Sequence, residues 1–167
     1  MATTMLKGNT VNLAGNEIKV GDKAPEVTVV NSNGLADKVV GGAQGKKQLI
    51  VVVPSLDTPV CATETRNFNK RAAEVEGVDV TVVSMDLPFA AGRFCSVEGI
   101  ESLVVASDFR NKDFANAYGV LIADGALAGV TCRAIFAVDA NGVVTYKEIC
   151  PEITAEPDYE SALNAVK

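Results

Sequence analysis

Two runs of aliphatic, mostly β-branched residues constrain the fold of this chain more than any other feature. Gln48–Pro54 reads QLIVVVP, and Val78–Met85 reads VDVTVVSM. Runs of this kind are typical of central strands in a sheet that is covered on both faces. Between them, Thr58 and Pro59 suit the N-cap and the first position of a helix, which we expect to run to about Glu76. The pattern predicts a strand–helix–strand unit at the centre of the fold.

The rest of the chain extends this unit into a larger α/β fold. Turn residues at Gly8-Asn9 and at Asp139–Gly142 each indicate a hairpin. Further strands are expected at Met5–Lys7, Val11–Leu13, Val27–Val30, Ser102–Ala106, Ala134–Val138 and Val143–Ile149. Helices are expected at Pro88–Phe94, Asn111–Tyr118 and Glu156–Val166, and the glycine-rich Lys38–Gly45 is expected to be a connection. The order predicts a three-layer α/β sandwich with a mixed central sheet and an N-terminal β-hairpin, as a single domain over residues 1–167.

The composition excludes several classes of function. Histidine is absent, which rules out Ser-His and Cys-His catalytic pairs and His-ligated metals. No C-x-x-C pair occurs, so neither a zinc ribbon nor the thioredoxin redox motif is present, and we expect no metal and no cofactor. A net charge of −6 with dispersed Lys and Arg argues against nucleic acid or a membrane surface as partner. Without a signal-like or membrane-spanning apolar stretch, we expect a cytoplasmic location, where thiols are kept reduced.

Cys61 is the candidate nucleophile. With Thr58 as N-cap, Cys61 is the third residue of the helix, close to unsatisfied backbone N–H groups and the positive end of the helix dipole. Both features favour the thiolate, which is the reactive form of cysteine. The Thr58 hydroxyl either caps the Cys61 N–H or faces the sulfur or a bound oxygen. The alternative interpretation, a small buried hydrophobe, suits Cys132 and Cys150 better.

The residues from Pro54 to Cys61 match the P-x-x-x-[TS]-x-x-C motif of the peroxiredoxins. Other segments resemble one subfamily, the atypical two-cysteine thiol peroxidases, and the similarity runs nearly end to end. These segments are Ser84–Phe89, Arg93–Cys95, Ser107–Arg110, Ala117–Val120 and Glu156–Glu160. The chain departs from the pattern at Pro59, where many relatives have glycine, and in having Cys132 and Cys150.

The resemblance implies a thioredoxin-like fold and the reduction of hydrogen peroxide and alkyl hydroperoxides to water or alcohols. It implies that Cys61 is the peroxidatic thiol and that Cys95, in the same subunit, is the resolving thiol. The family's site proline, hydroxyl and arginine correspond to Pro54, Thr58 and Arg133. Thioredoxin is the implied reductant, and a homodimer is the implied assembly.

Two alternatives remain at this stage. The same thiols would serve a redox sensor or disulfide oxidoreductase that passes oxidation to a protein target. The second alternative is a binding module on an inert thioredoxin-like fold. Such a module has no need of the full set of Pro54, Thr58, Cys61 and Arg133. Cys132 and Cys150 are expected to be dispensable; the register of the Asp139–Gly142 hairpin either pairs them or places them on opposite faces.

Overall fold

The structure is a computed structural model that describes residues 2–167, so Met1 lies outside the described part of the expected domain. The strands are β1 (Thr3–Leu6), β2 (Asn9–Ala14), β3 (Val27–Asn31), β4 (Asp37–Val40), β5 (Lys47–Val52), β6 (Val78–Ser84), β7 (Val104–Ser107), β8 (Leu121–Ile122), β9 (Ala134–Val138) and β10 (Val144–Ile149). The helices are α1 (Pro59–Ala72), α2 (Pro88–Glu98), α3 (Asp113–Tyr118) and α4 (Tyr159–Asn164).

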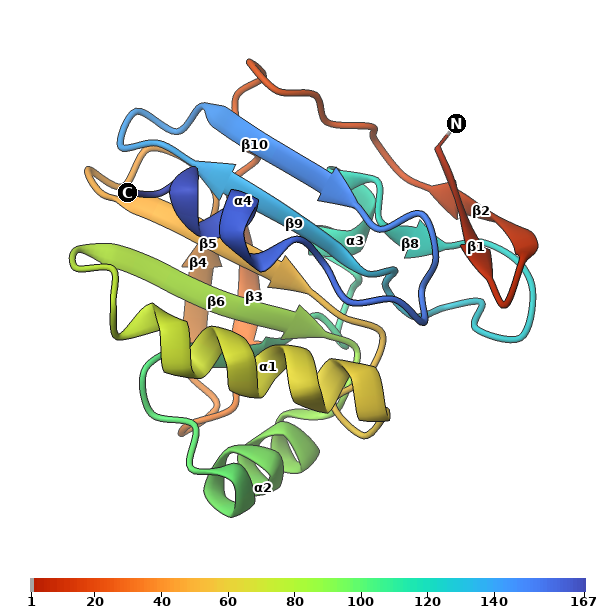
Figure 1. The fold of residues 1–167 in the computed structure, drawn as a ribbon, viewed down its shortest axis with the longest axis horizontal. Helices are drawn as coiled ribbons and strands as arrows, with labels where there is room; N and C mark the ends of the chain where they lie inside the picture. The colour runs from red at the N-terminus through yellow and green to blue at the C-terminus, as the bar shows by residue number, and fades with distance from the viewer. Residues whose placement is uncertain (1) are drawn as a thin grey trace.

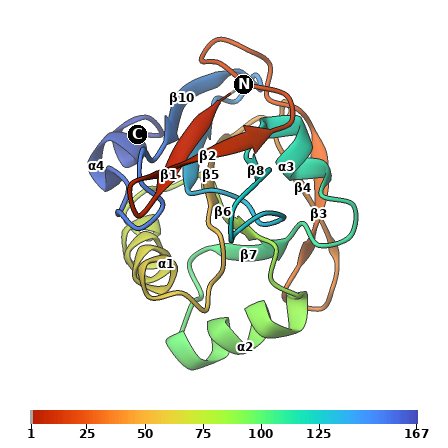
Figure 2. The same cartoon turned by 90° about the vertical axis from the view of Figure 1, so that its right-hand side faces the viewer.

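Seven strands form the central sheet, in the order β10-β9-β5-β6-β7-β3-β4. Figure 1 shows β10, β9, β5 and β6 side by side, and β7 is labelled in Figure 2. β5, β6 and β7 run parallel, and the pairings on either side of them are antiparallel. The predicted mixed sheet is therefore confirmed. The two apolar runs of the sequence are β5 and β6, which lie next to each other at its centre.

The side chains of β5 show why this strand has no polar alternation. Ile50 and Val52 belong to one buried cluster, whereas Leu49, Val51 and Val53 belong to another. Successive side chains of a strand point to opposite faces, so each face of the sheet needs its own apolar set. A strand that is buried on both faces must be apolar throughout.

The two faces are covered by different elements, which gives three layers (Figures 1 and 2). On one face, Phe68 of α1, Phe94 of α2 and Leu163 of α4 join the buried cluster. On the other face, Phe114 of α3 and Leu13 of β2 join the second cluster. β1 and β2 form the predicted N-terminal hairpin, and β8 pairs with β2 to complete a separate three-stranded sheet. The three-layer sandwich is confirmed, with this small sheet as part of its outer layer.

The structure corrects several expected elements. The Lys38–Gly45 connection contains most of β4, which forms because β3 supplies an antiparallel partner along its whole length. The two-residue β8 was not predicted, because such a short strand exists only through its pairing with β2. α1 ends at Ala72 instead of Glu76. α2 continues past Phe94 to Glu98, where Gly99 takes the left-handed conformation (φ 66°) that ends a helix.

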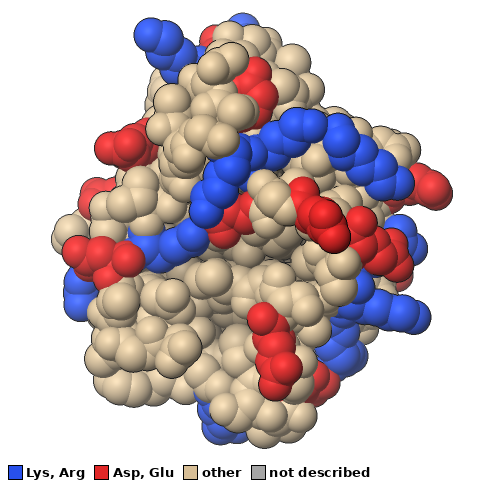
Figure 3. All heavy atoms as spheres, turned by 90° about the vertical axis from the view of Figure 1, so that its left-hand side faces the viewer, with Lys and Arg blue, Asp and Glu red and all other residues tan. Residues whose placement is uncertain are grey.

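The surface carries charges of both signs side by side. On the face shown in Figure 3, a band of Lys and Arg side chains is flanked by Asp and Glu. Among residues 2–167, no helix has the length and apolar character needed to cross a bilayer.

Candidate active site

Cys61 lies in the first turn of α1, just beyond the carboxyl end of β5. Thr58 is the N-cap and Pro59 begins the helix, so Cys61 is the third helical residue, as predicted. The side chain is fully buried, with 0% exposure, in the cluster that also contains Leu56 and Ala91. In this conformation the sulfur is closed off from solvent.

Arg133, immediately before β9, directs its guanidinium at this cysteine. Its Nη2 donates to Cys61 Sγ at 3.3 Å, its Nη1 donates to a carboxylate oxygen of Glu64 at 2.5 Å, and its Nε donates to the carbonyl of Ile153 at 2.8 Å. Only 2% of the residue is exposed, so Arg133 is not a surface ion-pair residue. Burial alone would lower the pKa of Arg133, but the neighbouring Cys61 and Glu64 raise it above its usual value. The guanidinium therefore keeps its positive charge beside the sulfur.

Glu64 is a site residue that the sequence analysis missed. It follows Cys61 by one helical turn and has 0% exposure. Burial raises the pKa of its carboxyl to about 7, even though Arg133 lowers it. The only signal in the sequence is a carboxylate three residues after Cys61, on the same side of the helix. That pattern alone does not distinguish a buried ion pair from an exposed one.

The segment between β5 and α1 carries Pro54 and Thr58. Pro54 is buried two residues after the end of β5. The Thr58 hydroxyl donates to the carbonyl of Ser55 at 2.8 Å and makes no capping bond, so the first of its two expected roles, the cap on the Cys61 N–H, is not observed. The hydroxyl turns back to the preceding loop because that carbonyl lies within its reach. The role of the Thr58 oxygen toward a substrate stays a prediction.

Asp86, just after β6, ties this segment to the neighbouring strand. Its carboxylate accepts hydrogen bonds from the Ser55 hydroxyl and the Leu56 N–H, both at 2.7 Å, and from the Ser84 hydroxyl at 2.8 Å. Asp86 lies in the Ser84–Phe89 segment that resembles thiol peroxidases, but the sequence alone indicates no role for it. The structure makes it the anchor of the loop that leads to Cys61.

Cys95 lies on α2, separate from the helix of Cys61. It lines a groove of about 720 Å³ between α2, β7 and the segment after β3. Burial raises the pKa of this thiol, and a hydrogen bond with Ser32 partly offsets the effect. All four cysteines are free thiols in this structure. Arg133 thus contacts Cys61 in the first turn of α1, Thr58 is the N-cap of the same helix, and Cys95 lies on α2.

Cys132 and Cys150 do not face each other. The Cys150 N–H donates to the carbonyl of Arg133, and a bulge at Val144–Tyr146 shifts the hairpin register that would have paired the two cysteines. Their side chains therefore belong to opposite faces of the sheet. Burial raises the pKa of Cys132 to about 12 and also raises that of Cys150. Both features suit structural, unreactive thiols.

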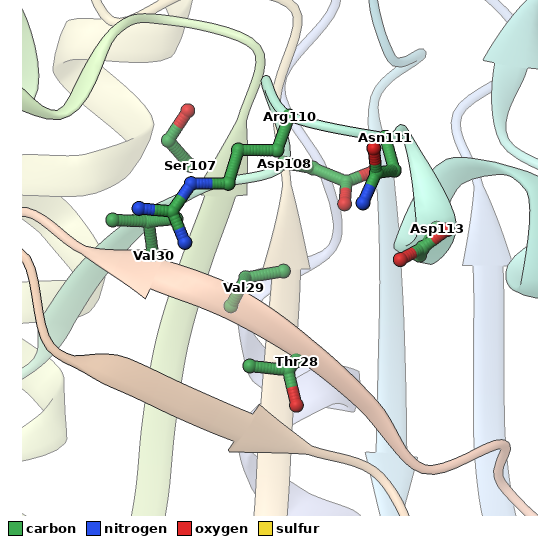
Figure 4. A pocket seen from close by; sticks show the side chains of 8 residues that line it. All are labelled: Thr28, Val29, Val30, Ser107, Asp108, Arg110, Asn111 and Asp113. Carbon is green, nitrogen blue, oxygen red and sulfur yellow. The ribbon is translucent and has the colours of Figure 1, made fainter.

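A second cavity, of about 140 Å³, lies between β3 and the segment that leads into α3 (Figure 4). Its Asp108 carboxylate accepts hydrogen bonds from the N–H groups of Phe114 and Ala115 at the start of α3. These bonds give the Asp108 carboxylate a structural role at the start of α3. Within residues 2–167, no three Cys, Asp or Glu side chains are grouped so that they could share a metal ion.

Known proteins resemble this chain over nearly its whole length. A family model described as Redoxin matches residues 19–163. A thiol peroxidase of Aquifex aeolicus is 56% identical over 165 residues, which are 99% of this chain and 96% of that protein. A thiol peroxidase of Campylobacter jejuni is 54% identical over 158 residues, 95% of this chain and 89% of that protein. The crystal structure of a peroxiredoxin-like protein from Aquifex aeolicus has a TM-score of 0.96 at 55% identity, and the match covers 99% of this chain and 96% of that one.

The chain has a thioredoxin-like fold, a buried cysteine at a helix start that contacts an arginine, and thiol peroxidase relatives. Together these features define its class, the thiol-dependent peroxidases of the peroxiredoxin type. The chain belongs to the Redoxin family.

Proposed function

We propose that the chain reduces hydrogen peroxide and alkyl hydroperoxides, with Cys61 as the attacking thiolate. The thiolate attacks the terminal peroxide oxygen; the S–O bond forms as the O–O bond breaks, and the departing oxygen takes a proton to give water or an alcohol. Cys61 is left as a sulfenic acid. The observation that carries this proposal is the contact of 3.3 Å between Arg133 Nη2 and Cys61 Sγ at a buried helix start.

Three other residues assist this step in the proposed mechanism. Arg133 stabilises the thiolate and the negative charge that develops on the peroxide oxygens, since a guanidinium is always charged and offers several N–H donors. Thr58 holds the peroxide in line through its hydroxyl, which is already at the helix start. Pro54, buried at the end of β5, shields the sulfur from water.

Cys95 completes the cycle as the resolving thiol of the same subunit. Its thiolate attacks the sulfenic sulfur of Cys61, which forms the disulfide and releases water. A protein dithiol of the thioredoxin type then reduces the disulfide through a mixed disulfide. Cys95 lines a groove at the surface. This placement supports the role, because a thiol of the protein reductant can approach the disulfide at Cys95 from solvent.

The test is peroxide-dependent consumption of NADPH with thioredoxin and thioredoxin reductase. The parent chain should turn over with hydrogen peroxide and with an alkyl hydroperoxide. Cys61→Ser should be inactive, because a serine hydroxyl is not ionised at neutral pH. Cys95→Ser should consume one equivalent of peroxide and then stop, and Cys132→Ser is the matched control that should turn over normally. Parent-rate oxidation of the Cys61→Ser chain would refute the assignment.

We further propose a homodimer in the cytoplasm, on the basis of the family resemblance. Light scattering of the purified, reduced chain should give twice the mass of one chain. A mass of one chain at micromolar concentration would exclude the dimer.

A further inference from the structure

Arg133 lies between two acidic groups, and all three are buried. One guanidinium nitrogen contacts Cys61 Sγ at 3.3 Å and another contacts Glu64 Oε2 at 2.5 Å. Cys61 and Glu64 each have 0% exposure. Water therefore stabilises neither the Cys61 thiolate nor the Glu64 carboxylate. The single positive charge of Arg133 is the nearest opposite charge to both. A buried site of this kind favours one negative charge over two.

The second oxygen of Glu64 strengthens this argument. Oε1 is buried and has no hydrogen-bond partner within the described residues. An ionised carboxylate normally accepts hydrogen bonds at both oxygens, and a buried charge that lacks them costs free energy. Glu64 as a neutral acid avoids much of that cost.

The groups around Glu64 act in the same direction. Glu148 on β10 and Glu156 before α4 raise its pKa through their negative charges, and Arg133 lowers it. Tyr159 on α4 and the Cys150 thiol also face it and would add negative charge only at high pH. With burial as the largest cause, the pKa of Glu64 is about 7, so both of its protonation states occur near neutrality.

We propose that Glu64 is a positioning residue whose ionisation competes with that of Cys61 for the charge of Arg133. When Glu64 holds a proton, the guanidinium charge is available to the Cys61 thiolate. When Glu64 is ionised, it neutralises Arg133, and Cys61 keeps its proton more readily. The two acids then titrate as a coupled pair instead of independently. The inference rests on the proposed function only in taking Cys61 as the reactive thiol.

The first test measures ionisation of Cys61 without any turnover. Reduced chains are alkylated with iodoacetamide across a pH series, and the reaction at Cys61 is followed by peptide mass spectrometry. Glu64→Gln retains an oxygen that can accept from Arg133 but removes the charge. Its alkylation should rise in a single step, with a half-point about one pH unit lower than in the parent chain, and should be about tenfold faster below that half-point. The parent chain should show a broader rise. Glu74→Gln, which removes an exposed carboxylate just after α1, is the matched control and should follow the parent.

Two results would overturn the proposal. One is a Glu64→Gln profile that coincides with the parent profile. The other is a uniform loss of rate at every pH with an unchanged half-point, which would mean that Glu64 only holds Arg133 in place. Because peroxide and thioredoxin are absent, a failed peroxidase assay would not alter the outcome, and a failed titration would leave the proposed function intact.

A second measurement uses the parent chain, so it does not depend on whether the variant folds. Near pH 7, alkylation replaces the Cys61 thiolate by a neutral thioether, which leaves the Arg133 charge to Glu64. Infrared difference spectra of a chain with carboxyl-labelled glutamate should then show loss of a protonated carboxyl band. A band that is unchanged by alkylation would contradict competition between the two acids.

Discussion

Arg133 donates through three of its nitrogens, to Cys61 Sγ, to the Glu64 carboxylate and to the carbonyl of Ile153. Arg133→Ala should slow the reaction with hydrogen peroxide by about 10²–10³-fold, because the thiolate and the developing charge lose their donor. It should also lower the free energy of unfolding by about 3 kcal/mol, since Glu64 is left buried and unpaired. Stopped-flow kinetics and denaturant unfolding measure the two effects.

The matched control is Arg66→Ala, which removes an arginine of α1 whose ion pair with Glu98 is partly exposed. It should change the free energy of unfolding by less than about 1 kcal/mol and leave the rate as it was. Equal effects of the two substitutions would contradict the role assigned to Arg133.

Glu64 predicts a pH dependence of stability. Its pKa is raised from 4.5 to about 7 in the folded chain, so the folded state binds this proton more tightly than the unfolded state does. The resulting stabilisation is fully present at a pH below the pKa of Glu64 in the unfolded chain, 4.5, and is lost as the pH rises through about 7. Relative to Glu64→Gln, the parent chain should lose about 2 to 3 kcal/mol of unfolding free energy between about pH 5 and about pH 8. Denaturant unfolding at both pH values, with Glu74→Gln as control, measures this. A constant difference would mean that Glu64 is ionised throughout.

The site residues differ in how far the sequence reveals them. The helix-start position of Cys61 follows from Thr58 and Pro59 alone, whereas Arg133 could be assigned only through the family resemblance. Glu64 and Asp86 were given no role because a carboxylate on a helix or after a strand is usually exposed. Their burial depends on contacts with Arg133 and with the Ser55 loop, which are distant in the sequence.

At the scale of elements, Asp86 fixes the loop between β5 and α1 to the end of β6. Asp86→Ala removes the acceptor of the Leu56 N–H and of two serine hydroxyls. Bonds to a charged acceptor contribute about 1.5 to 3 kcal/mol each at most, so we expect a loss of roughly 3 kcal/mol in total. Hydrogen exchange at Leu56 should become markedly faster. The control is Asp57→Ala, which removes an exposed carboxylate from the residue after Leu56. Equal exchange at Leu56 in both variants would contradict the anchoring role of Asp86.

The two reacting cysteines belong to two helices, and this predicts a conformational change. A disulfide needs Cα atoms within roughly 7 Å, yet Cys61 is buried in α1 and Cys95 lines a groove beside α2. We predict that the sulfurs are well apart in the reduced chain and that α2 and the first turn of α1 must loosen to join them. Closing the loop from Cys61 to Cys95 stabilises the oxidised chain by about 4 kcal/mol in the entropic model, and the lost helical packing offsets much of this.

Hydrogen exchange on the reduced and oxidised chains tests this change. Protection should differ mainly over residues 58–64 and 88–99. The central strands β5 and β6 serve as the internal reference and should exchange alike in both forms. Identical protection throughout would mean that the site is preformed and needs no local unfolding.

The elements that the sequence predicts well are those with a strong local signal. β5 and β6 follow from their apolar runs, and α1 begins at its Thr-Pro start. β4 and β8 were missed because they have little pattern of their own and form through pairing with β3 and β2. The early end of α1 was also missed, since residues 73–76 have no helix-breaking residue before Gly77.

At the scale of the whole molecule, the order of the strands explains the position of the site. β5 and β6 are parallel neighbours, so the Cys61 loop and Asp86 follow the carboxyl ends of adjacent strands. Sites in open α/β sheets gather at such ends. Arg133 reaches the same point because β9 runs antiparallel to β5, so that the start of β9 lies beside the end of β5. The sheet thus brings together residues that are far apart in the sequence.

Mapping of the disulfides after oxidation shows whether Cys61 and Cys95 of one chain form the catalytic disulfide. The reduced protein is treated with one equivalent of hydrogen peroxide, free thiols are blocked, and the peptides are identified by mass spectrometry without reduction. We predict a Cys61–Cys95 bond within one chain, with Cys132 and Cys150 recovered as blocked thiols, since they lie on opposite faces of the sheet. A Cys132–Cys150 bond formed during catalysis would contradict this assignment. So would a Cys61 that stays unpaired or pairs with any thiol other than Cys95 of its own chain.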